Sequence, residues 1–223
     1  MAIEIPVLND NFDLESAIEK TKTHGYAFED GAITQEIQDA LASEIDIVPL
    51  VLGDYVSNPL NLGQPNQVHQ RHSRAYYEYG DEAVPVANYV IESLALAVNS
   101  MTRYPELRSW RLSEVGYQRY RPTLDFIGPH RDRVSDTLLS ITLMFCGSTV
   151  VKIHEPLGAY RDYSNLLQID EVVTIPGTAM FLRAPGLGNG QQKIHEVLPP
   201  KEGIRNILNL RMRSTVLPPV VIL

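Results

Sequence analysis

The stretch "GPHRDR", at positions 128–133, places an imidazole and a carboxylate two residues apart, at His130 and Asp132. Residues i and i+2 of a strand project from the same face, so both side chains can reach one metal ion. A third ligand must come from another strand, and the candidate is His195 in "QKIHEVLPP". Two imidazoles and one carboxylate on one face of an ion leave its other positions open for reactants. The spacing therefore predicts a catalytic metal centre.

A cationic side chain follows the third ligand at the head of a predicted strand. Arg205 comes just after the Pro-Pro and Gly turn of "HEVLPPKEGIRNILNLRMR". Its guanidinium offers a fork of donors that matches a carboxylate and stays protonated at any working pH. It can therefore hold the distal carboxylate of a keto acid whose other end chelates the metal. Non-haem Fe(II) oxygenases use such an open ligand set to admit a cosubstrate and O₂.

Each of these residues also has an ordinary interpretation. His130 and Asp132 fit a turn in which the aspartate accepts backbone N–H bonds. Arg205 alone fits a surface strand residue with a solvated head group. The four residues in register favour the metal site over these separate interpretations.

The elements that must position these side chains are short strands. From about Trp110 the sequence consists of short runs rich in β-branched and aromatic residues, separated by turn residues. The runs are "EVGYQRYRP", "LLSITLMF", "TVVKIHEP", "EVVTIP", "AMFLRA", "KIHEVLPP" and "RNILNLRMR". No helical segment separates them, which favours an antiparallel sandwich or jelly roll over a parallel sheet. We expect residues 111–215 to form this jelly-roll catalytic core.

The first hundred residues have mostly helical periodicity. "DLESAIEKTKTHG" has apolar residues at i, i+3 and i+4 and ends at Gly25; "TQEIQDALASEI", capped by Thr34, and "NYVIESLALAVNSM" have similar stripes. We expect these helices to pack as a layer on the sheet. Residues 1–110 are thus predicted to be a helical support and lid region of a single domain, 1–223.

A polar, aromatic and aperiodic segment, 61–85, lies between the second and third predicted helices. Its composition predicts loops, with or without one short strand, that form either a solvated loop or part of a lid over the site. In the lid interpretation, Arg74 is a candidate to grip a substrate carboxylate, with Tyr76 beside it. His69 and His72 could bind zinc if the segment were helical.

Residues 111–215 resemble the Fe(II)/2-oxoglutarate-dependent dioxygenase superfamily. Members show H-x-D, a distant His, and an Arg or Lys shortly afterwards on the next strand of a double-stranded β-helix core. The resemblance implies Fe(II), 2-oxoglutarate as cosubstrate and O₂, with succinate and CO₂ as products and ascorbate as a candidate reductant. Halogenating relatives carry Gly or Ala where this chain has Asp132, so hydroxylation or desaturation is favoured.

The same resemblance assigns further cofactor-binding residues. Tyr120 is similar to a Tyr that many members carry before the first ligand, and it would hydrogen-bond 2-oxoglutarate; the alternative is a ring packed in the core. Arg205 and Arg211, with Asn209 between them and Gln118 upstream, resemble the strand pattern of the AlkB-type demethylases. Arg211 is either a cosubstrate or substrate contact or a structural ion pair. A shorter gap after His195, and no upstream segment that resembles a basic nucleotide-recognition lid, set the chain apart from that branch.

Composition limits the partners and the compartment. The 223 residues carry a formal net charge of -8, which argues against a nucleic-acid substrate. No apolar run could span a membrane. The acidic N-terminal stretch does not resemble a signal peptide, and the single Cys146 cannot form an internal disulfide, so we expect a cytoplasmic protein.

The sequence thus predicts a dioxygenase acting on a small organic molecule. An AlkB-like nucleic-acid demethylase is one alternative, and a non-catalytic jelly-roll protein that binds a small molecule or metal is another. The apolar tail 216–223 is a candidate final strand, clasp on the core, or contact between subunits of a homo-oligomer.

Overall fold

The computed structural model describes residues 5–57, 68–112, 114–133, 135–158, 163 and 165–213. Its strands join one antiparallel sheet. They are β1 Tyr26–Glu29, β2 Val51–Ser57, β3 Val68–Tyr77, β4 Glu114–Tyr120, β5 Phe126–His130, β6 Asp136–Cys146, β7 Thr149–Pro156, β8 Leu166–Thr174, β9 Ala179–Arg183, β10 Ile194–Val197 and β11 Arg205–Arg213. All seven predicted runs after Trp110 are strands.

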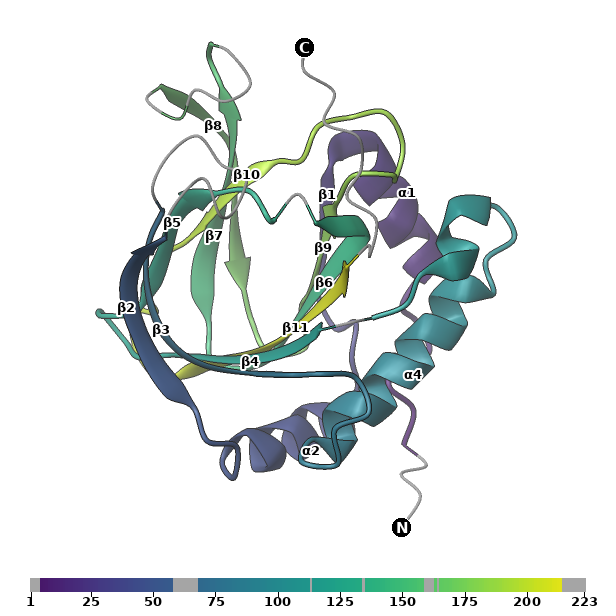
Figure 1. Ribbon diagram of the computed structural model, residues 1–223, viewed down its shortest axis with the longest axis horizontal. Coiled ribbons are helices and arrows are strands. Elements are labelled where there is room, and N and C mark those ends of the chain that lie inside the picture. The colour runs from purple at the N-terminus through teal and green to yellow at the C-terminus, as the bar shows by residue number, and fades with distance from the viewer. Residues whose placement is uncertain are drawn as a thin grey trace.

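The sheet curls into a barrel-like shape (Figure 1). Its strand order is β1-β9-β6-β11-β4-β3-β5-β10-β7-β8, and β2 pairs with residues 68–74 of β3. The long β3 joins two parts of the sheet, because residues 73–77 pair with β4 and residues 70–71 pair with β5. This arrangement confirms the predicted double-stranded β-helix, or jelly-roll, core.

Three helices cover one side of the sheet, as predicted: α1 Leu14–His24, α2 Gln35–Ile45 and α4 Pro85–Asn99, followed by the short 3-10 helix η1 Pro105–Ser109. Their ends follow the expected capping rules. Thr34 Oγ1 accepts from the N–H of Ile37 at the start of α2. Gly25 ends α1 with a φ of 95°, and its N–H donates to the Thr21 carbonyl oxygen at 2.9 Å.

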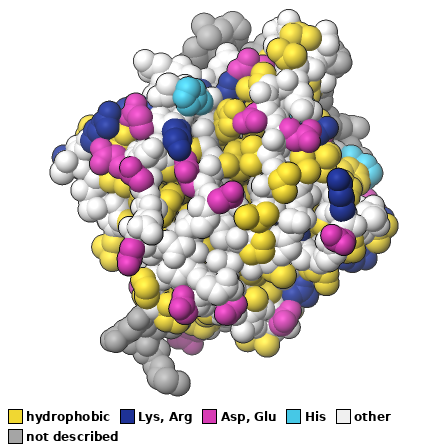
Figure 2. Space-filling model, turned by 180° about the vertical axis from the view of Figure 1, so that it is seen from behind, with side chains coloured by type: hydrophobic (Ala, Val, Ile, Leu, Met, Phe, Trp, Pro, Cys, Tyr) yellow, Lys and Arg dark blue, Asp and Glu magenta, His cyan; other side chains and the backbone are white. Residues whose placement is uncertain are grey.

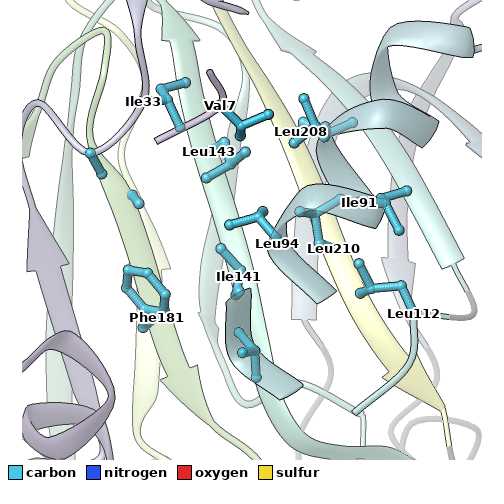
Figure 3. Close-up of a cluster of buried hydrophobic side chains, with 14 of the residues drawn as sticks. Val7, Ile33, Ile91, Leu94, Leu112, Ile141, Leu143, Phe181, Leu208 and Leu210 are labelled. Carbon is cyan, nitrogen blue, oxygen red and sulfur yellow. The ribbon is translucent and has the colours of Figure 1, made fainter. Parts of the chain in front are cut away.

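The main hydrophobic core lies between these helices and the sheet (Figure 3). Leu208 and Leu210 of β11 and Ile141 of β6 meet Ile91 and Leu94 of α4 there, and each is at most 2% exposed. Burying an aliphatic side chain of this size contributes about 1.5–3 kcal/mol. The core therefore fixes the outer face of the strands whose other face lines the barrel.

One buried carboxylate ties this layer together. Glu44 of α2 accepts from the backbone N–H groups of Val86 and Ala87, at 2.6 and 3.0 Å, and from the Tyr117 hydroxyl at 2.5 Å. The two amides belong to the first turn of α4, where a negative charge is favourable. Glu44 thus links α2, α4 and β4 through three hydrogen bonds.

The expectation of a mostly helical 1–110 region was wrong in part. β1, β2 and β3 lie within it and join the sheet. The segment 61–85, predicted as loops with one short strand, contains the ten-residue β3 from Val68 to Tyr77. Both faces of β3 carry polar residues, so the alternation that normally reveals a strand is weak.

On the face drawn in Figure 2, acidic and basic side chains of the described residues are interspersed. Among the described residues, no helix combines the length and the apolar character needed to cross a membrane. The tail 216–223, a candidate strand, clasp or subunit contact, lies outside the described residues.

Candidate metal centre and its two cavities

Two strands bring the histidines together. His130 ends β5 and His195 lies on β10, where the two are direct Cα partners in the antiparallel ladder. Their ring centroids are 4.1 Å apart. With Asp132 they form a group whose ligand atoms all lie within 4.8 Å of one another, close enough for one ion to bind all three.

Asp132 is not placed in the way the sequence suggested. β5 ends at His130, so Asp132 lies beyond the strand, and the i, i+2 alternation does not position it. Instead Arg211 Nη2 donates to its Oδ1 at 2.8 Å. Of the two roles considered for Arg211, the structure shows the ion pair. The Nε of Arg211 also lies 3.7 Å from Oδ2 of Asp136.

This ion pair keeps Asp132 ionised. Burial alone would raise the pKa of Asp132, but Arg211 and the two imidazoles lower it to about 2. Burial also raises the pKa of Asp136 to about 6, although Arg211 opposes that shift. Asp132 is therefore a carboxylate, the form that binds a metal, across the physiological range.

Both imidazoles are held in the neutral, metal-binding form. Burial, and then the neighbouring His195, lower the pKa of His130 to about 3. Burial likewise lowers the pKa of His195. The Nδ1 of His130 lies 2.9 Å from the Gly128 carbonyl oxygen, which can only accept, so Nδ1 carries the proton and Nε2 has a free lone pair.

An inner cavity lies beside the three ligands within the barrel. Its lining includes all the residues that the resemblance assigned to cosubstrate binding: Gln118, Tyr120, Arg205, Asn209 and Arg211. These come from β4 and β11. The free volume is only about 30 Å³, room for little more than a water molecule. A keto acid would therefore have to displace lining side chains or extend outwards.

Arg205 lies in this cavity with unsatisfied donors. Its side chain is fully buried, and its guanidinium carbon lies 5.0 Å from the centroid of the Tyr120 ring. Among the described residues, nothing accepts a hydrogen bond from its Nε or Nη1. Burial lowers the pKa of Arg205, because it removes the guanidinium from water, although Tyr120 opposes that shift. Buried unpaired donors are costly, and a bound anion would satisfy them.

The neighbours of Arg205 present further polar groups. The Tyr120 hydroxyl donates to Oε1 of Gln118 at 2.6 Å, and burial raises the pKa of Tyr120, so it stays a donor. Thr142 Oγ1 donates to Oδ1 of Asn209 at 2.6 Å, which orients the Asn209 amide. Gln118, Tyr120 and Asn209 thus line the inner cavity together with Arg205, each held by a hydrogen bond.

The sequence interpretation missed His72 as part of this region. Its ring stacks on Tyr120, with centroids 5.2 Å apart and planes 19° apart, and neither ring nitrogen has a partner among the described residues. Burial, and then Arg74, lower its pKa to about 3. The zinc pair with His69 is wrong. On a strand, residues i and i+3 face opposite sides, and His69 is exposed beside Asp54, 3.2 Å away.

An outer cavity of about 190 Å³ adjoins the inner one and shares the lining residues Gln118, Ile127, His130, Asp132 and Arg211. Arg74 and Tyr76 also line it. They belong to β3, in the wall of the barrel, so the expectation that they sit on a lid loop was wrong. Tyr55, from the unpredicted strand β2, lines the same cavity.

A larger cavity of about 410 Å³ lies beyond Arg131 and is lined mainly by residues of β7 and of the segment before β10. Its lining includes none of the three metal-ligand candidates. The candidate metal site therefore adjoins the two smaller cavities and not the larger one.

No protein-family model matches the sequence, and no curated protein matches it. Solved structures do match. A prolyl-4-hydroxylase from Pseudomonas putida is 16% identical, covers 90% of this chain and 99% of its own, and has a TM-score of 0.56. A viral collagen prolyl hydroxylase from Paramecium Bursaria Chlorella virus-1, solved as a 2OG complex, is 15% identical, covers 86% and 97%, and has a TM-score of 0.53.

A 2OG-Fe(II) oxygenase family structure from Burkholderia pseudomallei is 13% identical, covers 91% of each chain, and has a TM-score of 0.51. At these identities the likeness shows a shared fold. The chain shares the fold of these structures over 86–91% of its length.

Proposed function

We propose that this chain is an Fe(II)/2-oxoglutarate-dependent dioxygenase that hydroxylates or desaturates a small organic molecule, with succinate and CO₂ as products. One observation carries the proposal. His130, Asp132 and His195 converge within 4.8 Å, and the cavity that they share with Arg205 contains that residue's unpaired, buried guanidinium donors. A metal ion would bind the three ligand side chains, and an acidic cosubstrate would accept hydrogen bonds from the guanidinium of Arg205.

The residues present fit both groups. Two neutral imidazoles and an ionised carboxylate are the donor set of non-haem iron sites with open positions. Bound Fe(II) supplies activation of O₂ together with oxidative decarboxylation of the keto acid. Arg211 keeps Asp132 charged and oriented, and the His130 tautomer is set by the Gly128 carbonyl oxygen.

Arg205 is the proposed partner of the distal carboxylate of 2-oxoglutarate, with the Tyr120 hydroxyl as a second donor. For Tyr120 to donate to the carboxylate, it must leave its present acceptor, Oε1 of Gln118. The inner cavity is also too small for the cosubstrate as it stands, so the side chains that line it must move when the cosubstrate binds. We therefore expect Gln118 and Tyr120 to change their hydrogen bonds when the cosubstrate binds.

Apolar side chains complete the inner cavity: Ile127, Met180, Leu182, Val197 and Ile207. They exclude water from the reacting centre, which protects a reactive oxidant from side reactions. Ascorbate is a candidate reductant for keeping the iron as Fe(II). The net charge of -8 and the single Cys146 support a small-molecule substrate and a cytoplasmic location as parts of the proposal.

The test is an anaerobic titration of the purified protein with Fe(II) and then 2-oxoglutarate, followed by visible absorption. We expect a weak metal-to-ligand charge-transfer band that requires both additions. A non-catalytic metal-binding protein would take up Fe(II) without the band, and a metal-free binding protein would do neither. Succinate formation after O₂ is admitted then separates catalysis from binding. Absence of the band at saturating Fe(II) and 2-oxoglutarate would reject the proposal.

A further inference from the structure

The outer cavity is lined by four arginines, Arg74, Arg131, Arg133 and Arg211, although the chain as a whole is acidic. Two of them already have carboxylate partners. Arg211 pairs with Asp132, and Arg133 lies 3.6 Å from Glu114. Arg131 donates to the Gln192 carbonyl oxygen and to the Tyr163 hydroxyl.

Arg74 contacts two tyrosines, Tyr55 and Tyr76. Its Nη1 donates to the Tyr55 hydroxyl, which is a neutral partner. Its guanidinium carbon lies 4.6 Å from the centroid of the Tyr55 ring and 5.4 Å from that of Tyr76. No carboxylate of the described residues lies within ion-pair distance of Arg74. A planar cation held by two aromatic rings is oriented without being neutralised.

Both rings occupy space left by a glycine. A Cβ added at Gly116, the partner of Tyr76 on β4, would lie 2.6 Å from the Tyr76 ring. A Cβ added at Gly53 of β2 would lie 2.8 Å from the Tyr55 ring. Any side chain at either position would have to push the ring aside. The two strands that pair with β3 in this region, β2 and β4, thus leave room for the rings that hold Arg74.

The charge of Arg74 is not needed by the proposed metal and cosubstrate. The two positive charges of Fe(II) balance the two negative charges of 2-oxoglutarate. Arg205 already faces the inner cavity from β11. Arg74 lines the outer cavity, whose lining also includes His130 and Asp132. A cavity of about 190 Å³ has room for a molecule of roughly amino-acid size.

We propose that the primary substrate is a small organic acid and that Arg74, held between Tyr55 and Tyr76, binds its carboxylate. This inference rests on the proposed function for the identity of the reaction, but the anion site itself does not require the metal. The forked donors of Arg74 would take the carboxylate, and the rest of the molecule would extend towards His130 and Asp132.

The experiment uses a broad panel of small monocarboxylic acids, each paired with its primary amide. Two properties are measured: the shift in melting temperature of the metal-free protein, and the rate of succinate formation with Fe(II), 2-oxoglutarate and O₂. We expect one or more acids to raise both, and the matching amides to raise neither. An acid that binds at Arg205 instead would compete with 2-oxoglutarate and inhibit, so stimulation identifies the outer cavity.

The variants Arg74→Gln and Arg74→Lys then test the residue. Loss of a charge-assisted, forked contact should raise the half-saturating concentration of a stimulating acid by about 10- to 100-fold in Arg74→Gln. Arg74→Lys should recover only part, since a point charge cannot copy the fork. Gly116→Ala, which displaces the Tyr76 ring, should weaken acid binding too. Arg108→Gln, at an exposed site on η1, is the matched control.

Three outcomes would overturn the inference: amides that stimulate as well as their acids, an unchanged half-saturating concentration in Arg74→Gln, or no acid that acts in either assay. The charge-transfer titration of the native protein separates this failure from failure of the proposed function. A band without acid binding removes the acid site alone. Acid-induced stabilisation of the metal-free protein that is lost in Arg74→Gln, without any band, removes the dioxygenase alone.

Discussion

The two faces of β11 show two different kinds of protein interior. Leu208 and Leu210 point outwards into the helix-covered core (Figure 3), where both are completely buried. Arg205, Asn209 and Arg211, in the same strand, line the inner cavity. Successive side chains of a strand face opposite sides, so one segment serves stability and chemistry at once.

Polar groups on the two sides are satisfied to different degrees. On the helix side, Glu44 accepts three hydrogen bonds, and the Trp110 indole donates to the Leu139 carbonyl oxygen at 3.1 Å. Inside the barrel, Arg205 and His72 keep buried nitrogens without partners among the described residues. Native structures rarely tolerate such groups without a reason. This contrast between Glu44 and Trp110 on one side and Arg205 and His72 on the other supports the proposal that the barrel interior binds ligands.

The largest expected effect comes from removing a proposed metal ligand on the cavity side. His130→Ala, Asp132→Ala and His195→Ala should each lower Fe(II)-dependent succinate formation by at least about 10⁴-fold, because the ion cannot be held in a reactive arrangement. Circular dichroism should show that each variant stays folded. Full activity in any one variant would remove that residue from the metal site.

A change on the opposite face should have the reverse pattern. Leu208→Ala should lower the free energy of unfolding by about 2–5 kcal/mol, because it opens a cavity in the packed core. Urea unfolding measures the loss, and a calorimetric titration with Fe(II) at low temperature should give nearly native affinity. A large loss of metal affinity in the folded variant would contradict the separation of the two faces.

Replacing Arg205 should stabilise the folded protein and weaken its binding of 2-oxoglutarate. Arg205→Met removes a buried, unpaired charge, so the unfolding free energy of the cosubstrate-free protein should rise by about 1–3 kcal/mol. The charge-transfer band should then need far more 2-oxoglutarate, while Fe(II) affinity stays nearly native. If Arg205→Met were less stable and still bound 2-oxoglutarate normally, Arg205 would be a structural residue.

The helix side of the fold was predictable from the sequence because hydrophobic contacts there obey a simple period. Apolar stripes and the cap residues Thr34 and Gly25 predict α1, α2 and α4. The strands after Trp110 are dense in β-branched and aromatic residues, which predicts an antiparallel core. The convergence of His130, Asp132 and His195 could be predicted because a metal site constrains residue type and order.

Strand β3 was not predictable from the sequence because the residues that face the cavities are polar. Its inward residues Gln70, His72, Arg74 and Tyr76 are polar or amphipathic because they line or adjoin the cavities. A strand with polar residues on both faces does not alternate in hydrophobicity. The position of Asp132 depends on Arg211, far away in the sequence, and no local pattern contains that contact.

The smallest expected effect concerns His72, whose burial predicts a pH-dependent loss of stability. Its pKa falls from 6.5 to about 3 in the folded protein. A group with a lowered folded-state pKa contributes stability above its unfolded pKa, and that contribution is lost as pH falls, because the unfolded chain takes up the proton first. Between pH 7.5 and pH 5 this loss amounts to about 2 kcal/mol.

His72→Phe keeps an aromatic ring against Tyr120 but cannot be protonated, so it should remove this share of the acid sensitivity. Urea unfolding of the metal-free protein at pH 7.5 and pH 5 measures the difference. His69→Phe, at an exposed site on the same strand, controls for loss of a histidine. The native protein should lose about 2 kcal/mol more than His72→Phe over that interval. The buried histidines His130 and His195, whose pKa values are also lowered, account for sensitivity that remains. If the native protein and His72→Phe lost the same free energy of unfolding, His72 would have a proton-accepting partner or solvent access in solution. The contrast between the barrel interior and the helix side would then rest on Arg205 alone.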